Sequence, residues 1–288
     1  MGAWGAGLYD DDTAGDLKNT IALVAKVPED GDRLLQMLKD VQGNVDPADE
    51  DGSLFWLVVA DQFEKKGIHC RDASETALAI IESERDLAHC RARGADEKFL
   101  RERARSLGEL AERLRSPRPA KARPKAAKPP SLVLETGQVH AFPTMQGNAW
   151  HPYRLPAHGS FVPDGWGALA VLDTGRAFDW LPWVALAGLM VPPDTKPTLD
   201  AALDARLIFH PQTRGAGRFV PKPAHAKGLA LELLGHVDLD ASRVTPHLSK
   251  WPVKRAIQFD WTIAYGALTS ASKPSDTSSG LRLRSLCL

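Results

Sequence analysis

Several features of membrane and secreted proteins are missing from this sequence. No apolar run reaches about 18 residues, the length that a membrane-spanning helix needs, so no transmembrane segment is predicted. The first residues lack the basic and apolar regions of a secretory signal. Cysteine is scarce and odd in number, with Cys70, Cys90 and Cys287 far apart, which favours a reducing compartment over a disulfide framework. We therefore expect a cytoplasmic protein without membrane association.

Recognisable catalytic and metal-binding motifs are also absent. The nine histidines form no His-x-His or His-x-x-x-His pair, so zinc is not expected. There is no Gly-x-Ser-x-Gly elbow, and neither Cys70 nor Cys90 has the supporting signature of a nucleophile. The glycine-rich start has no strand before it, as a phosphate loop requires. We expect no catalytic residues, no cofactor and no metal, with an active site assembled from distant residues as an open alternative.

The chain has no overall excess of either charge, with 36 basic and 36 acidic side chains, but the two signs are unevenly distributed. Residues 1–64 contain 14 acidic and 4 basic side chains, and residues 1–115 contain 24 and 16. Residues 116–288 reverse this balance, with 12 acidic and 20 basic side chains. An asymmetry of this kind concerns binding partners more than the fold.

A proline-rich basic segment divides the chain. Residues 116–130 contain five prolines and five cations, with no acidic and no large apolar side chain, so they cannot form a core and are expected to be an extended linker. Its cations could contact nucleic acid, but no aromatic side chain is present to stack on bases, which favours a spacer. The cations concerned are Lys121, Arg123, Lys125 and Lys128. The predicted parts are a helical domain (1–115), the linker (116–130), a β-rich domain (131–271) and a mobile tail (272–288).

Apolar residues before the linker recur at three- and four-residue spacings, which predicts an all-α domain. Asp12 or Thr13 is expected to cap the first helix, so that Asp10, Asp11 and Asp12 lie at the positive end of its dipole. We predict five helices, near residues 13–27, 34–43, 53–67, 72–81 and 100–114.

Two acidic runs in this domain could be taken for metal ligands. Adjacent carboxylates diverge around a helix start, whereas a hard metal ion needs several oxygens that converge from a turned loop. Helix capping and surface charge are therefore the favoured interpretation. The runs are Asp10, Asp11 and Asp12, and Asp49, Glu50 and Asp51.

After the linker, short alternating segments separated by glycine and proline predict a β-rich domain. The expected strands lie near residues 133–142, 150–155, 168–172, 205–209, 229–234 and 257–261, with turns at 145–148 and 173–175. Together the two halves predict an α+β fold in two segregated domains, the second a small bent sheet or partly open barrel. Most of its tryptophans are expected in the core. Trp180 and Trp183 flank a proline turn, so they are candidates for an exposed interface, with burial in the core as the favoured interpretation.

The first sixteen residues, Met1-Gly-Ala-Trp-Gly-x-Gly-Leu-Tyr-Asp-Asp-Asp-Thr-Ala-x-Asp16, carry a resemblance. They resemble the start of a bacterial domain-of-unknown-function family that opens with Met-Gly-x-Trp-Gly-x-Gly and an acidic helix start. The runs 54–63 and 77–81 resemble longer members, and the resemblance covers about residues 1–130. It implies no catalytic residue set.

The second half is similar to a β-rich immunity-protein family of polymorphic toxin systems. The similarity lies in Glu135-Thr-Gly-Gln-Val-His-Ala-Phe-Pro143, in Gly147 and in Leu231-Glu-Leu-Leu-Gly-His-Val-Asp-Leu239. The family pattern has Asp, Leu and Pro where this chain has Gln138, Thr144 and Asp238. The resemblance implies a protein that binds a toxin and performs no chemistry itself.

We therefore predict a non-catalytic, immunity-type protein that neutralises a toxin or effector, such as a nuclease, through an acidic surface. Acidic surfaces complement the basic clefts of nucleases and accelerate association. The candidate electrostatic contacts are Asp10, Asp11, Asp12, Asp49, Glu50 and Asp51, and the candidate aromatic contacts are Trp180 and Trp183. The alternative is a nucleic-acid-associated or regulatory module that uses the basic linker and the β-rich domain.

Overall fold

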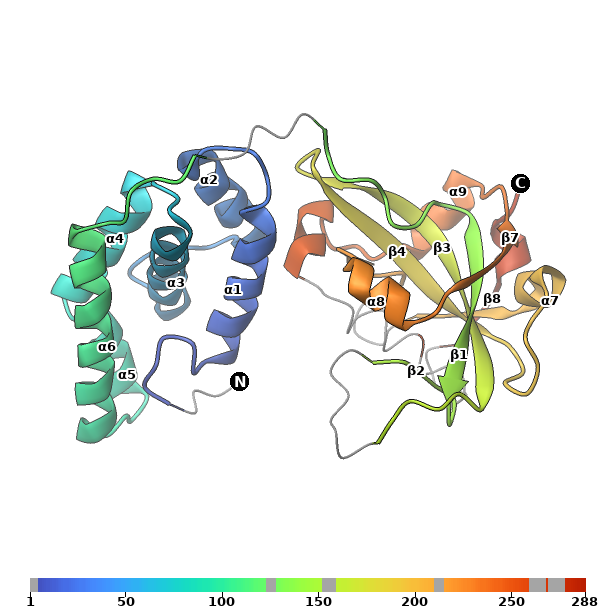
Figure 1. Ribbon diagram of the computed structural model, residues 1–288, viewed down its shortest axis with the longest axis horizontal. Helices are drawn as coiled ribbons and strands as arrows, with labels where there is room; N and C mark the ends of the chain where they lie inside the picture. The colour runs from blue at the N-terminus through green and yellow to red at the C-terminus, as the bar shows by residue number, and fades with distance from the viewer. Residues whose placement is uncertain (1–4, 123–127, 152–158, 210–214, 259–267, 269–277) are drawn as a thin grey trace. The chain divides into compact units, whose positions relative to one another are not determined.

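A computed structural model describes residues 5–122, 128–151, 159–209, 215–258, 268 and 278–288. The chain divides into two compact units, a helical unit, Met1–Lys128, and a sheet unit, Pro129–Leu288. The boundary between them lies within the segment that the sequence predicts as a linker. Helices precede an antiparallel sheet along the chain (Figure 1). The predicted α+β class with segregated parts is confirmed.

The described part of the helical unit contains one helix more than the sequence predicts. The unpredicted helix, α5, has few apolar side chains, and only Asp86, Leu87 and Cys90 are buried in it. Its short, polar sequence therefore shows no amphipathic period. The helices are α1 (Asp12–Val24), α2 (Gly31–Gln42), α3 (Glu50–Lys66), α4 (Arg71–Glu82), α5 (Arg85–Ala92) and α6 (Glu97–Arg115).

Helix α3 is the centre of the helical unit. It lies among the other helices of the unit (Figure 1) and contacts α1, α4, α5 and α6. Nearly every residue from Gly52 to Glu64 is buried. A helix that is apolar on all sides has to lie inside a protein. Burying each large apolar side chain, such as Phe55 or Phe63, contributes about 1.5–3 kcal/mol. The helix ends where predicted, at Gly67, whose φ of 66° is the left-handed conformation that glycine adopts without strain.

The glycine-rich start folds against the first acidic run. The Asp10 carboxylate accepts a hydrogen bond from the Gly7 N–H at 2.9 Å, and a Cβ atom at Gly5 would overlap the same carboxylate. The glycines thus allow the close backbone turn that the sequence suggests. Trp4, which we expected to fill the helical core, lies outside the described residues.

The sheet unit is built on an open antiparallel sheet with the strand order β2-β1-β3-β4-β5-β8, in which β6 also pairs with β4 and β7 with β1. The strands are β1 (Gln138–Met145), β2 (Asn148–Ala149), β3 (Gly165–Ala177), β4 (Leu181–Met190), β5 (Arg206–Ile208), β6 (Arg218–Phe219), β7 (Glu232–His236) and β8 (Ser278–Arg282). The short helices are α7 (Leu199–Asp204), α8 (Pro223–Gly228), α9 (Ala241–Val244), η2 (Thr245–His247), η3 (Val253–Gln258) and η5 (Leu283–Leu286).

Two predicted turns have different outcomes. The turn at 145–148 is confirmed: Gln146 and Gly147 have φ values of 51° and 71°, which suit a two-residue hairpin loop. The turn at 173–175 is wrong, because these residues lie inside β3, where the register with β4 shifts between Val171 and Asp173. A β-bulge accepts the same residue types as a turn. The chain reverses instead at residues 178–179, which both have positive φ.

The predicted strands are only partly correct. The segments 168–172 and 205–209 contain strand residues of β3 and β5, while 133–142 and 229–234 overlap the starts of β1 and β7. Residues 257–258 belong to η3 instead of a strand, and 259–261 lie outside the described residues, as do 152–155. Strand β4 was not predicted as a strand, since its continuous apolar run lacks the alternation of a half-buried strand.

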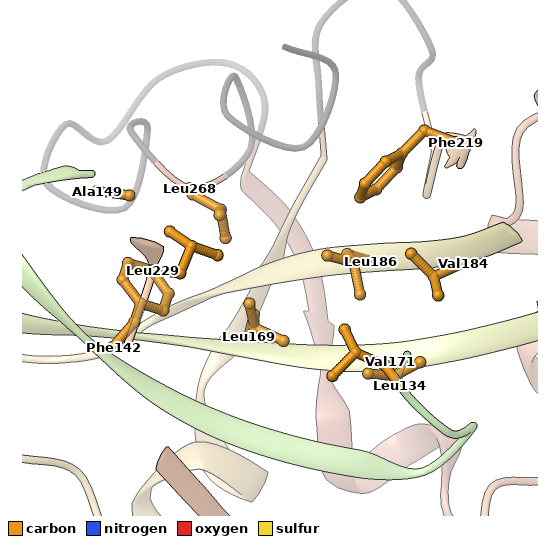
Figure 2. Packing of buried hydrophobic residues seen from close by; sticks show 10 residues of the cluster. All are labelled: Leu134, Phe142, Ala149, Leu169, Val171, Val184, Leu186, Phe219, Leu229 and Leu268. Carbon is orange, nitrogen blue, oxygen red and sulfur yellow. The ribbon is translucent and has the colours of Figure 1, made fainter. Parts of the chain in front are cut away.

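The core of the sheet unit lies on one face of β3 and β4. Leu169 and Val171 of β3 and Val184 and Leu186 of β4 point to this face, and the residues that alternate with them, such as Ala170 and Ala185, are buried on the opposite face. Figure 2 shows these side chains gathered with those of neighbouring elements into one cluster. The other members are Leu134, Phe142, Ala149, Phe219, Leu229 and Leu268.

The last residues are packed, whereas the sequence predicts a mobile tail from residue 272. Strand β8 pairs with β5, and Leu283 and Leu286 of η5 are buried. The Arg284 guanidinium also contacts Asp204 at 2.8 Å. Residues 272–277 lie outside the described part of the chain.

Candidate functional site

The two predicted acidic runs begin neighbouring helices of the helical unit. Asp11, and not Asp12 or Thr13, is the N-cap of α1: its carboxylate accepts hydrogen bonds from the N–H groups of Thr13 at 2.8 Å and Ala14 at 3.3 Å. Asp49 is the N-cap residue of α3, and Glu50 begins that helix. Carboxylates at both positions lie at the positive ends of the helix dipoles.

The fold brings part of the two runs together. Asp11, Glu50 and Asp51 line one cavity of about 40 Å³, and Asp12 is exposed in the first turn of α1. We call Asp11, Asp12, Glu50 and Asp51 the acidic face. Arg93 pairs with Glu50 at 2.6 Å, which neutralises only part of this charge.

The carboxylates of Asp10 and Asp49 form hydrogen bonds within the loops that precede α1 and α3. Asp10 binds the Gly7 N–H, and Asp49 accepts a hydrogen bond from the Asn44 amide at 2.9 Å. Their carboxylates hold the two loops that precede α1 and α3. Neither carboxylate lines the cavity that Asp11, Glu50 and Asp51 share, so we leave both out of the acidic face, although Asp49 is exposed.

A buried ion pair lines the same cavity. The Arg103 guanidinium donates two hydrogen bonds to Asp86, at 2.8 and 2.9 Å, and a third to the carbonyl of Gly7 at 3.1 Å. Both side chains are less than a tenth exposed. The pair joins α5, α6 and the glycine-rich start, which positions the loop that leads into Asp11.

Among the described residues, no group of three or more His, Cys, Asp or Glu side chains is arranged to hold a metal ion. The thiols do not have the low pKa of a nucleophile. Burial raises the pKa of Cys70 to about 11 and also raises the pKa of Cys90. Both side chains are therefore protonated thiols at neutral pH.

A second polar cluster was missed in the sequence. Asp61 lies in the apolar helix α3 and is almost fully buried. Its carboxylate accepts hydrogen bonds from the Tyr9 hydroxyl and from Arg113 at 2.5 Å, and Lys65 pairs with it at 2.8 Å. The Gln62 amide donates to the Tyr9 hydroxyl at 2.6 Å. Charged residues within an otherwise apolar helix are the signal that could have found this cluster.

The chemistry of this cluster favours a structural role. Burial, followed by the hydrogen bond to Asp61, raises the pKa of Tyr9 well above its usual value. The phenol therefore stays protonated and acts as a donor. A buried carboxylate that is fully paired with cations costs less than an unpaired one, so the cluster ties the N-terminal loop and α6 to α3.

A larger cavity, of about 240 Å³, lies where α3 ends and α4 begins. Its apolar wall includes Phe63, Ile68 and Leu114. Its polar wall includes Glu64, whose side chain is 3% exposed, and Arg118, whose Nε lies 3.0 Å from a Glu64 oxygen.

The aromatic candidates of the sheet unit are not both on the surface. Trp183 is 5% exposed and packs under Arg218, whose guanidinium lies 5.3 Å from the ring centre. It is therefore a core residue, and the expectation of a surface contact does not hold for it. Trp180 is half-buried at the reversal between β3 and β4.

The cations of the predicted linker are only partly described. The backbone N–H of Lys121 donates to the carbonyl of Gly67 at 3.0 Å, so this residue is held against the helical unit. Lys128 is exposed. Arg123 and Lys125 lie outside the described residues.

No helix in the described ranges has both the length and the apolar character to cross a membrane. No family model matches the chain, and the comparisons found neither a curated relative nor a solved structure similar to it. The two family resemblances therefore rest on their sequence motifs.

Proposed function

We propose that this is a cytoplasmic, non-catalytic binding protein of the immunity type, which neutralises a basic toxin or effector through its acidic face. The observation that supports this most directly is that Asp11, Glu50 and Asp51 line one cavity at the starts of α1 and α3. Residues about 40 positions apart in the sequence thus contribute carboxylates to one cavity, whose lining also includes Arg93 and Arg103, and Asp12 is exposed at the start of α1.

Electrostatics gives this surface a physical role. A nuclease holds its substrate in a positively charged cleft, and a carboxylate surface on a rigid helical scaffold can occupy that cleft in place of phosphates. Because α1 and α3 pack against each other through the buried core, the carboxylates keep their spacing before binding. Such preorganisation lowers the entropic cost of association.

The proposal is tested by co-expressing the full chain with the product of its neighbouring gene and measuring cell survival and complex formation. Neutralising the acidic face with Asp11→Asn, Asp12→Asn, Glu50→Gln and Asp51→Asn is expected to slow association by on the order of tenfold at low salt. Equal cell death with and without the protein, or the absence of a complex, would overturn the proposal.

A matched control has the same change in net charge on another helix. Glu97, Glu102, Glu109 and Glu112 are exposed on α6. Changing these four to Gln is expected to slow association much less than neutralising the acidic face when both variants are also measured at physiological ionic strength, where charges outside the contact are screened beyond about 8 Å. Helix content measured by circular dichroism shows whether both variants fold.

The alternative is a nucleic-acid-binding role for the sheet unit, and one observation favours it. Lys250, Lys254 and Arg255 are exposed on either side of the half-buried Trp251. Arg218 donates to the carbonyls of Ser249 and Trp251 at 3.0 and 3.2 Å, which fixes this segment. Cations next to an aromatic side chain suit phosphate contact and base stacking.

A salt titration separates the two functions. Binding to DNA or RNA that weakens steeply with salt would support the alternative. Two sets of neutralising changes then locate the contact: one at Lys250, Lys254 and Arg255, and one at Lys121, Arg123, Lys125 and Lys128. Absence of binding at low salt would remove this alternative.

A further inference from the structure

The chain that follows α6 folds back against the helical unit. Pro117 and Pro119 cannot continue a helix, because proline has no backbone N–H and its ring restricts the residue before it to extended conformations. Ser116 accordingly leaves the helix with φ −127° and ψ 66°. We call residues 117–121 the strap. At its end, the Lys121 N–H donates to the Gly67 carbonyl at 3.0 Å.

One side chain and two backbone groups hold the strap. The Arg118 Nε lies 3.0 Å from the Glu64 carboxylate. The Arg118 carbonyl lies 2.9 Å from His69 Nε2, and because a carbonyl only accepts, His69 is the donor. At Gly67 a Cβ atom would come within 2.9 Å of Lys121 Cγ, so glycine permits this close approach. These contacts recognise an extended backbone with an arginine side chain.

The strap contacts a buried carboxylate, that of Glu64. Its side chain is 3% exposed, and its Oε2 accepts no hydrogen bond within the described residues, while Arg113 Nε lies 3.5 Å away. A buried carboxylate is costly unless cations pair with it closely, and the Arg113 contact at 3.5 Å is longer than a charge-assisted hydrogen bond. The groove thus presents a fixed negative charge that a guanidinium can neutralise, and in this chain Arg118 does so from a position that is 60% exposed.

The strap forms one wall of the cavity of about 240 Å³, through Pro117 and Arg118. The opposite wall is apolar and includes Phe63, Ile68 and Leu114. A cavity of about 150 Å³ is enough to bind a benzene ring. The space next to the arginine site is therefore large enough for an aromatic or large aliphatic side chain, and the strap has only proline on both sides of Arg118.

We infer that the groove between the end of α3 and the start of α4 binds an extended segment of another protein, one with an arginine next to a large apolar residue. The strap occupies this groove within the chain and competes with that segment. A tethered competitor has an effective concentration on the order of millimolar. The apolar side chain of the partner supplies the additional contacts that displace it. This inference concerns a different surface from the acidic face and does not depend on it.

The experiment uses the full chain in two forms. In the first form, Arg118→Asp repels Glu64, and Lys121→Pro removes the N–H that binds Gly67, so the strap leaves the groove. The second form is the unaltered chain. The probe is a synthetic peptide with the sequence of residues 116–122 in which phenylalanine replaces the first proline. Its binding is followed by NMR chemical shifts of residues around Glu64.

The peptide is expected to bind the Arg118→Asp, Lys121→Pro chain at least tenfold more tightly than the unaltered chain, because the strap no longer competes. Replacing arginine by alanine in the peptide, or adding Glu64→Gln to the chain, is expected to weaken binding at least tenfold. Replacing phenylalanine by the original proline is expected to weaken it severalfold. Equal binding of the peptides with and without arginine, or no binding to the opened chain, would overturn the inference.

A second measurement applies if the opened chain does not fold. In the unaltered protein the Lys121 amide should exchange with solvent at least tenfold more slowly than an amide in an unstructured peptide, because it donates to Gly67. Glu64→Gln should remove this protection, and Glu75→Gln, which changes an exposed carboxylate on α4, should leave it intact. Fast exchange of Lys121 in the unaltered protein would show that the groove holds no strap and would overturn the inference.

Discussion

Single residues determine how the N-terminal loop is held, and Arg103 is the clearest case. Its guanidinium binds Asp86 with two hydrogen bonds and the Gly7 carbonyl with a third. Arg103→Leu leaves the Asp86 carboxylate buried without its cation, which is expected to lower the free energy of unfolding by about 3 kcal/mol. Urea unfolding followed by circular dichroism at the helix band measures this change.

Two further variants show whether unpaired charge is the cause. Replacing both partners, as in Arg103→Leu with Asp86→Leu, leaves no buried charge and should recover much of the lost stability. Arg115→Leu removes an exposed pair with Glu82 and should cost less than about 1 kcal/mol. A double variant no more stable than Arg103→Leu would contradict this explanation.

His140 makes the stability of the sheet unit depend on pH. It is buried in β1, and burial lowers its pKa from the usual value of about 6.5. The unfolded chain therefore takes up a proton near pH 6.5, and the folded chain does so only at lower pH. The stability that neutral His140 provides is present above pH 6.5 and is lost as the pH falls through the folded pKa, by up to about 1.4 kcal/mol per pH unit.

Urea unfolding of the unaltered chain and of His140→Gln at pH 7.5, 6.5 and 5.5 tests this dependence. The difference in unfolding free energy between the two proteins should shift in favour of the variant as the pH falls, because glutamine does not titrate. The exposed His236 provides the control, and His236→Gln should keep the pH dependence of the unaltered chain. A difference that is constant with pH would exclude His140 as the titrating group.

At the scale of elements, the packing around a helix can reverse the effect that a residue's helix propensity has on protein stability. Alanine normally stabilises a helix interior by about 1 kcal/mol relative to glycine. Gly108→Ala in α6, where a Cβ atom meets nothing within 4 Å, should follow this rule. Gly52→Ala in α3 should destabilise the protein instead, since its Cβ atom would overlap the backbone carbonyl of Asp46. Thermal unfolding of the two variants should give opposite signs, and a shared sign would contradict the packing argument.

The sequence predicts best those elements whose conformation follows from the pattern of their own residues. The helical period and the glycine after it define α3 at residues 50–66, close to the prediction. The polar helix α5 and the fully apolar strand β4 were missed, because contacts from neighbouring elements, and not a period in their own sequence, fix their conformation. At 173–175 a bulge uses the residue types of a turn, and only the register of β3 with β4 distinguishes the two.

In the candidate sites, too, local features could be predicted from the sequence, and contacts between distant residues could not. That acidic residues begin α1 could be predicted, because capping is local. That Asp11 and Glu50 line one cavity depends on the packing of α1 against α3, which no local pattern encodes. Glu64 and its contact with Arg118 connect residues 54 positions apart. The sequence offers only a hint in that case: an acidic residue next to Phe63 in an apolar helix.

At the scale of the whole molecule, the two units should fold without each other. Each has its own buried core and exceeds about 100 residues, a size at which single domains are stable. A chain of residues 1–128 should therefore keep its helix content, and a chain of residues 129–288 its sheet. The urea midpoint of each fragment should equal that of the corresponding transition in the full chain. If either fragment has a clearly lower midpoint or fails to fold, the units stabilise each other, and the full chain is a single cooperative body.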